Sequence, residues 1–112
     1  MAETIKVLGQ SSGTAAASVY GVLYACPTAT QAVLSTIAVC NTASTAATYR
    51  IAISAASAAP VASEFLVFGS TVNANDSVFL TLGATMTATQ KWLNISSSAS
   101  TVTFSAFGIE NT

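Results

Sequence analysis

The sequence predicts an all-β fold, a single-domain antiparallel β-sandwich of the jelly-roll or immunoglobulin-like type with about 7–8 strands. Three observations lead to this prediction. Turn-forming residues recur at short intervals, the stretches between them are rich in Val, Ile, Leu, Phe and Tyr, and most stretches alternate apolar with small or polar residues. A helical repeat of about 3.6 residues explains the same segments less well.

The expected strands are separated by short turns. In chain order the strands are Thr4–Leu8, Ala17–Ala25, Gln31–Cys40, Thr48–Ser54, Glu64–Phe68, Ser77–Leu82, Lys91–Ser96 and Thr101–Ile109. The turns are Gly9–Thr14, Pro27–Thr30, Asn41–Thr45, Ser54–Pro60, Asn73–Asp76, Gly83–Thr89 and Ser96–Ser100. Alternation places on one face of their strands Tyr49, Ile51 and Ile53, then Val78, Leu80 and Leu82, then Leu93 and Ile95, and finally Val102, Phe104 and Ala106. Trp92 and Asn94 then face outward.

Asn73-Ala74-Asn75-Asp76 is the clearest turn, because Asn and Asp tolerate left-handed backbone and bond to their own main chain. It lies between Phe65–Phe68 and Val78–Leu82, so these strands are expected to pair as an antiparallel hairpin. The alanine-rich tract Ala52–Ala62 is compatible with one helical turn, limited by Pro60.

The composition suggests a surface that is covered in an assembly. A length of 112 residues is typical of one domain, so residues 1–112 are expected to fold as one sandwich. Hydrophobic residues make up 52% and charged residues 6%, against about 25% charged in an average domain. No charge occurs between Lys6 and Arg50. A surface with so few charges repels other copies of the chain only weakly. We therefore expect other subunits to cover much of this surface.

Composition also argues against several kinds of ligand. The net charge is -1 and the basic residues Lys6, Arg50 and Lys91 are scattered, so no nucleic-acid partner is expected. No membrane contact is expected either, because no unbroken run of about 20 apolar residues is present. Cys26 and Cys40 are too widely spaced for a metal motif, and there is no histidine, so neither a metal nor a cofactor is expected. Free thiols are favoured, since a disulfide requires the flanking strands to pair in the right register.

An enzymatic role is not expected. The carboxylates are Glu3, Glu64, Asp76 and Glu110. Each is interpreted as a solvated terminal, strand-end or turn residue rather than as half of an acid–base pair. A serine nucleophile needs a nearby base, and only Lys6 or Lys91 is available. Asp76 with Asn73 and Asn75 lacks the further carboxylates of a calcium loop.

Most aromatic residues are expected in the core from their position in the strands. They are Tyr20, Tyr24, Phe65, Phe68, Phe79, Trp92, Phe104 and Phe107. Trp92, beside Lys91, is the aromatic expected nearest to an edge. Since interfaces favour Trp and Arg as anchors, Trp92 and Arg50 are the expected subunit contacts. The alternative is that Trp92 caps the core and Arg50 is solvated.

Segments in order along most of the chain form a further pattern. They are Val7–Ser12, Leu23-Tyr24 with Pro27, Ala32–Asn41, Ala47–Ala52, Val72–Ser77 with Leu80–Gly83, and Phe104–Gly108. Together they resemble a family of small tailed-bacteriophage virion proteins. The resemblance implies a phage-encoded β-sandwich within the particle, either on the capsid or in the tail or neck.

We therefore expect a non-enzymatic virion component, a multimeric capsid cement or decoration protein that stabilises contacts between shell subunits. The expected partners are other virion proteins, above all the major capsid protein, and further copies of the chain in a closed symmetry such as a trimer. The expected location is the virion, assembled in the host bacterial cytoplasm. One alternative is a tail or neck adaptor or fibre-base component. Another is a host-surface glycan-binding module with Trp92 exposed on a loop.

Overall fold

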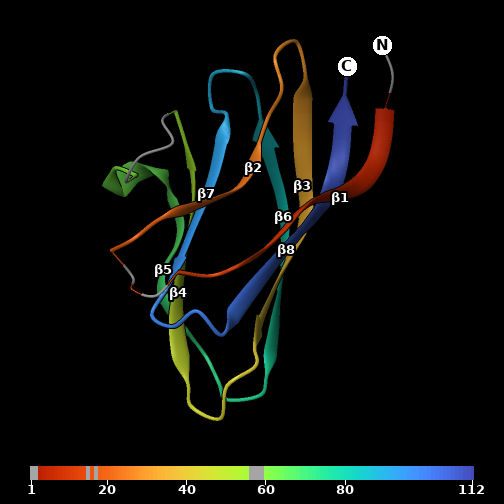
Figure 1. Ribbon diagram of the computed structural model, residues 1–112. Coiled ribbons are helices and arrows are strands. Elements are labelled where there is room, and N and C mark those ends of the chain that lie inside the picture. The colour runs from red at the N-terminus through yellow and green to blue at the C-terminus, as the bar shows by residue number, and fades with distance from the viewer. Residues whose placement is uncertain (1–2, 15, 17, 56–59) are drawn as a thin grey trace.

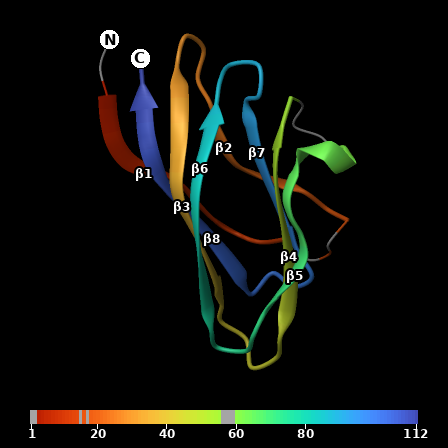
Figure 2. The same cartoon turned by 180° about the vertical axis from the view of Figure 1, so that it is seen from behind.

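The computed structural model describes residues 3–14, 16, 18–55 and 60–112. These residues form eight β-strands and one short 3-10 helix. The elements are β1 (Glu3–Ser12), β2 (Gly21–Ala25), β3 (Gln31–Asn41), β4 (Ala47–Ser54), η1 (Ala62–Glu64), β5 (Phe65–Val72), β6 (Ser77–Met86), β7 (Trp92–Ser97) and β8 (Val102–Asn111). They build two sheets that face each other (Figures 1 and 2).

The strand order identifies the type of sandwich. Sheet A has the order β1-β8-β3-β6 and sheet B has the order β2-β7-β4-β5. All pairs are antiparallel. Chain neighbours lie in opposite sheets except β4 and β5, which is the arrangement of a jelly roll. The prediction of an all-β sandwich is confirmed, and the topology selects the jelly roll over the immunoglobulin-like alternative.

Every expected strand is present, but four boundaries were wrong. β5 ends at Val72 rather than at Phe68. β1 continues to Ser12 where a turn was expected, with a bulge between Val7 and Gly9. Gly9 is required there, because a Cβ would lie 2.1 Å from the carbonyl oxygen of Leu23 in β2. β6 continues to Met86, and β2 begins at Gly21 rather than at Ala17, which lies outside the described residues. In the tract expected to make a helical turn, residues 56–59 are likewise outside the description, and the 3-10 turn lies at its end, Ala62–Glu64.

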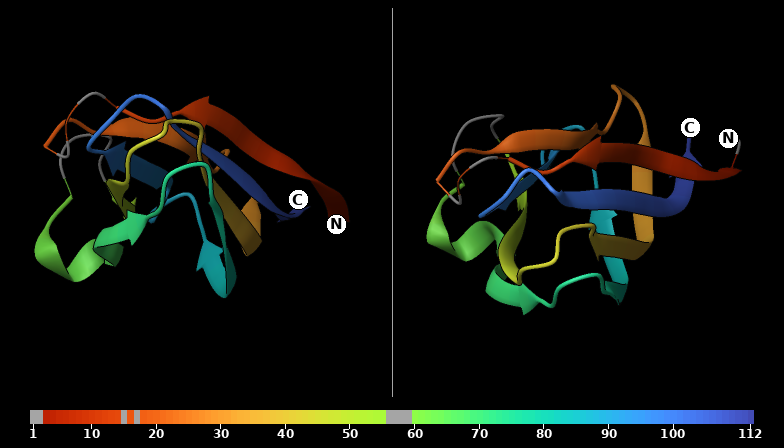
Figure 3. Two further views of the ribbon diagram at one scale, coloured as in Figure 1. Left: turned by 90° about the horizontal axis from the view of Figure 1, so that it is seen from below. Right: turned by 60° about the horizontal axis from the view of Figure 1, so that its bottom comes forward.

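The expected hairpin around Asn73–Asp76 was wrong. The turn itself forms, with Asn75 in the left-handed region at φ 53°. However, β5 pairs with β4 in sheet B, whereas β6 pairs with β3 in sheet A. The turn bonds to the loop beside it instead: the Asn75 amide donates to the Ala43 carbonyl and the Asn41 amide to the Asp76 carbonyl, both at 2.9 Å. The two loops run side by side at this end of the sandwich (Figure 3).

The Asn41 side chain holds these loops together from the inside. It is 1% exposed. Its Nδ2 donates to the carbonyl oxygens of Thr45, Val72 and Asn73 at 2.8, 3.4 and 3.3 Å. Its Oδ1 accepts a hydrogen bond from the Ala43 amide at 3.1 Å. A buried amide that satisfies this many main-chain groups fixes the crossing from β5 to β6.

The core lies between the sheets, and the inward faces predicted from alternation for β4, β7 and β8 contribute to it. Its largest fully buried side chains include Leu34, Ile37, Ile51, Leu93, Ile95, Val102 and Phe104. Tyr24 is buried as expected. Two aromatics were wrongly expected in the core: Phe68 and Phe79 are 63% and 68% exposed, because each lies on the outer face of its sheet. Tyr20, Phe65, Trp92 and Phe107 are half-buried.

Candidate functional site

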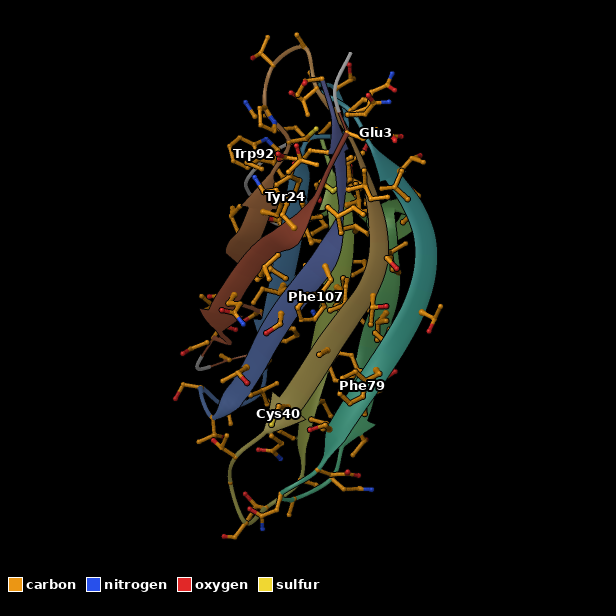
Figure 4. The ribbon with its side chains drawn as sticks, turned by 90° about the vertical axis from the view of Figure 1, so that its right-hand side faces the viewer. Glu3, Tyr24, Cys40, Phe79, Trp92 and Phe107 are labelled. Atoms are coloured by element: carbon orange, nitrogen blue, oxygen red, sulfur yellow. The ribbon has the colours of Figure 1, made fainter. Side chains whose placement is uncertain are left out.

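The outer face of sheet A presents an ordered set of side chains. The register aligns them in rows across β1, β8 and β3, starting where β1 begins and β8 ends. The rows are Ile5, Ile109 and Val33; then Val7, Phe107 and Thr36; then Gln10, Ser105, Ala38 and, from β6, Phe79; and last Ser12, Thr103, Cys40 and, from β6, Ser77. Figure 4 shows the molecule from the side of this sheet, with Phe107, Phe79 and Cys40 labelled.

The first two rows form an apolar patch, defined here as Ile5, Val7, Val33, Phe107 and Ile109. Ile5 is 84% exposed, and Val7 and Val33 are 48% and 41% exposed. A shallow groove of about 300 Å³ runs between the side chains of β1 and β8. Contiguous exposed apolar side chains of this kind mark a surface that another molecule covers.

Charge is nearly absent from this face. Lys6 and Glu110 alternate with the apolar patch and lie on the other side of the sheet, where they form an ion pair with N–O distance 2.9 Å. Glu3 shares the phase of Ile5 and is the charged residue at the rim of the patch. A partner that covers the face therefore has almost no charge to desolvate.

Sheet B carries a different site on its outer face, around Arg50. The Arg50 guanidinium stacks on Phe68, with Cζ 4.1 Å from the ring centre, and its Nη1 donates to the Tyr20 hydroxyl at 2.8 Å. Phe65 meets Phe68 edge to face at 4.9 Å between ring centres. Together with Pro60 and Ala62 these residues line a pocket of about 420 Å³. We call this the Arg50 pocket.

Trp92, the other residue expected at an interface, lies on the same face but apart from Arg50. Trp92 pairs with Ser54 and Arg50 pairs with Ser96, so four residues of strand, about 13 Å, separate them. The Lys91 ammonium lies 5.1 Å from the centre of the Trp92 indole. The structure therefore does not join the two residues into one site, and their role as subunit contacts stays a prediction.

Part of sheet B is already covered by the chain itself. Asn94, which was expected to face outward, and Ser96, which shares its phase, are both fully buried. The segment after β1 binds β7: the Ser97 amide donates to Thr14 Oγ1 at 3.0 Å, and the Thr14 amide donates to Ser97 Oγ at 2.9 Å. Among the exposed large apolar residues, Ile5, Val7, Val33 and Phe79 lie on sheet A, and Val22, Leu66 and Phe68 lie on sheet B.

Glu110 was wrongly expected to be a solvated terminal residue. Its side chain is 12% exposed, and it accepts hydrogen bonds from the Tyr24 hydroxyl of sheet B and from Lys6 Nζ. The bond from Tyr24, followed by that from Lys6, lowers the pKa of the Glu110 carboxyl. Burial, followed by the hydrogen bond to Glu110, raises the pKa of Tyr24. This contact links the two sheets at the end where β1 begins, and it accounts for two of the few charges by internal pairing.

The Glu110 contact predicts acid sensitivity. Because its folded pKa is lowered, ionised Glu110 stabilises the fold above the unfolded pKa, about 4.3, and this contribution is lost as the pH falls through the folded value. Tyr24→Phe is expected to lower the free energy of unfolding by about 2 kcal/mol at pH 7, and the difference from the parent chain should shrink by pH 3. Urea unfolding at both pH values measures this, with Tyr20→Phe as the hydroxyl-deletion control. A difference that is unchanged at pH 3 would contradict the linkage.

Other chemistry is sparse in the described part of the chain. It contains no cluster of three or more His, Cys, Asp or Glu side chains placed to hold a metal ion. None of its helices is long and apolar enough to cross a membrane. Cys26 and Cys40 are free thiols, the first buried and the second on the outer face of sheet A. Burial raises the pKa of the Cys26 thiol, whose Sγ donates to the Thr30 carbonyl at 3.3 Å.

The apolar patch and the Arg50 pocket went unrecognised in the sequence, although a signal for the patch was present. Phe107 and Ile109 alternate with the inward-facing Ala106 and Gly108, so β8 is apolar on both faces, which indicates a strand covered on both sides. The bulge after Val7 hid the corresponding phase of β1. Nothing local in the sequence places Tyr20 beside Arg50, because the two lie in different elements.

Fold and surface together define an eight-stranded jelly-roll sandwich with an uncharged apolar outer face. No protein-family model and no curated protein matches the chain. Solved structures of infectious bursal disease virus do match in fold. A chain of the T13 IBDV viral particle aligns with 96% of this chain and 30% of its own length, at TM-score 0.51 and 11% identity.

Structures of the Gx and Gt strains of that virus align with 97% and 96% of this chain. Their TM-scores are 0.49 and 0.46, and their identities are 14% and 11%. The aligned region covers 30–32% of the length of each matched viral chain, so this chain spans about a third of them. The likeness to the chain of the T13 particle, at 11% identity, is one of fold.

Proposed function

We propose that the protein is a non-enzymatic structural component of a virus particle and that it assembles by burying the apolar patch of sheet A against a neighbouring subunit. The observation that carries this proposal is the patch itself, with Ile5 at 84% exposure beside Val7, Phe107 and Ile109 on a face almost without charge. The fold shared with a chain of the T13 IBDV viral particle supports it.

The finer role that we propose is a multimeric cement or decoration protein of a bacteriophage capsid. The sequence resemblance to small tailed-phage virion proteins supports this assignment. In that role many copies bury apolar area between shell proteins, and repeated weak contacts add up to strong attachment. A specific contact buries about 800 Å² on each partner, an area that one outer face of a small sandwich can supply.

Self-association of the purified chain tests the general proposal. Light scattering over a range of concentrations is expected to give a mass that is a multiple of the 11.3 kDa chain mass. Binding to particles that lack the protein, followed by electron microscopy, tests the finer role. Unstable heads in the absence of the protein support a cement function, whereas intact heads with defective tails indicate a tail or neck component. A chain that stays monomeric and binds no particle contradicts the proposal.

A further inference from the structure

We infer that the Arg50 pocket receives the Asp76 carboxylate of a second copy of the chain, in a head-to-tail contact between subunits. This inference rests on the proposed structural function and names a second contact, distinct from the apolar patch. Its argument starts from the way in which the few charges are used within one chain.

Three of the seven charged side chains are neutralised or held internally. Lys6 and Glu110 form an ion pair, and no other ion pair is found among the described residues. The Glu64 carboxylate accepts hydrogen bonds from the amides of Val61 and Ala55 at 3.0 and 3.2 Å, and these bonds lower its pKa. Glu3, Arg50, Asp76 and Lys91 have no ion-pair partner among the described residues, although Arg50 donates to the Tyr20 hydroxyl and Asp76 accepts from the Ser77 amide. They are two cations and two anions, so pairing between copies can neutralise what pairing within one copy does not.

The Arg50 pocket is prepared for a carboxylate. Among the described residues, Nη1 donates to the Tyr20 hydroxyl and Nη2 makes no hydrogen bond; Nε also lacks a partner but is buried, so Nη2 is the donor that stays accessible to a carboxylate. The Phe68 ring on one side and the Tyr20 hydroxyl fix the plane of the guanidinium. A fixed guanidinium with unused donors in an apolar recess binds a carboxylate strongly, because little side-chain entropy is lost and water is excluded. Lys91, the other unpaired cation, lies against Trp92 and not in this pocket.

Asp76 is the carboxylate best placed to enter a recess. It is exposed at the end of a tight turn, whereas Glu3 lies within edge strand β1. Its Oδ1 accepts from the Ser77 amide at 2.8 Å, and its other oxygen has no partner among the described residues. The turn is held rigidly by the main-chain bonds to Asn41 and Ala43. A preformed turn presents its carboxylate without a large ordering cost.

The contact uses different surfaces on the two copies, so it is heterologous. Such contacts close into a ring when the rotation between copies allows, and otherwise continue into an extended assembly. Either outcome leaves the apolar patch of every subunit available for its own partner. A subunit with two independent contacts is what a shell or a decorating array requires.

Paired charge reversal tests the inference. Arg50→Asp and Asp76→Arg each place like charges in the contact, so each variant alone is expected to associate roughly 30-fold more weakly than the parent chain. In an equimolar mixture each reversed pocket meets a reversed turn of the other variant, and association is expected to recover. Sedimentation velocity measures all three samples, with circular dichroism to show that each variant is folded. Recovery on mixing cannot arise from a folding defect.

Matched controls make the outcome specific. Lys91→Asp reverses the other unpaired cation of sheet B and is expected to leave this contact unchanged. Normal association of the Asp76→Arg variant, or no recovery in the mixture while the parent chain assembles, overturns the inference and leaves the proposed function standing. A parent chain that stays monomeric overturns the inference, and one that also binds no particle overturns the proposed function as well.

Discussion

Ile5→Lys is expected to weaken self-association by roughly 100-fold or more while leaving the fold intact. Ile5 is 84% exposed in the isolated chain, so the substitution costs the folded subunit little. In the assembly the same position lies in the first row of the apolar patch, beside Ile109. The variant loses the burial of an isoleucine side chain, about 2 kcal/mol, and must also desolvate an ammonium group.

Gln10→Lys is the matched control for Ile5→Lys. Gln10 lies on the same strand and the same face, but outside the apolar patch, where its side chain bonds to Ser105. It is expected to associate nearly as the parent chain does, because a lysine there can remain at the edge of the contact. Sedimentation velocity across a dilution series, with thermal unfolding of both variants, provides the comparison. Equal weakening by the two substitutions would show that the apolar rows are not the specific contact.

Asn41→Leu is expected to lower the free energy of unfolding by about 3 kcal/mol and the melting temperature by about 10 °C. Leucine is close to asparagine in shape, so the effect comes from polar groups and not from a cavity. The carbonyl oxygens of Thr45, Val72 and Asn73 lose their donor, and the Ala43 amide loses its acceptor. One of these hydrogen bonds is buried and three are part-buried, and removing the shared partner of four main-chain groups is strongly destabilising.

Asn73→Ala is the control for Asn41→Leu. It changes a residue of the same loops without removing the hydrogen bonds of the buried Asn41 side chain. Asn73 is exposed, and its main-chain carbonyl, which alanine retains, is the group that bonds to Asn41. Its free energy of unfolding is expected within about 0.5 kcal/mol of the parent chain. Urea titration of both variants gives the two values. A loss below about 1 kcal/mol for Asn41→Leu would mean that water replaces the amide, and the loops would then not depend on it.

The candidate site shows how far sequence reasoning reaches. Arg50 was expected to be a subunit contact, together with Trp92, because interfaces favour these residue types, and that role stays a prediction. The aromatic residues around it were expected in the core, because strand phase gives two faces but does not say which face is inward. Glu110 illustrates the same limit: its partners Lys6 and Tyr24 are 104 and 86 residues away along the chain.

The sequence by itself determined the class of fold, the place of every strand and the inward face of β4, β7 and β8, since side-chain alternation and turn chemistry act between near neighbours in the chain. Tertiary structure decided which sheet each strand joins. The turn at Asn73–Asp76 is equally able to close a hairpin or to cross between sheets, and long-range bonds to Asn41 and Ala43 select the crossing. Tertiary structure also decided which apolar residues stay outside, because the bulge after Val7 turns Ile5 and Val7 away from the core and brings Leu8 into it.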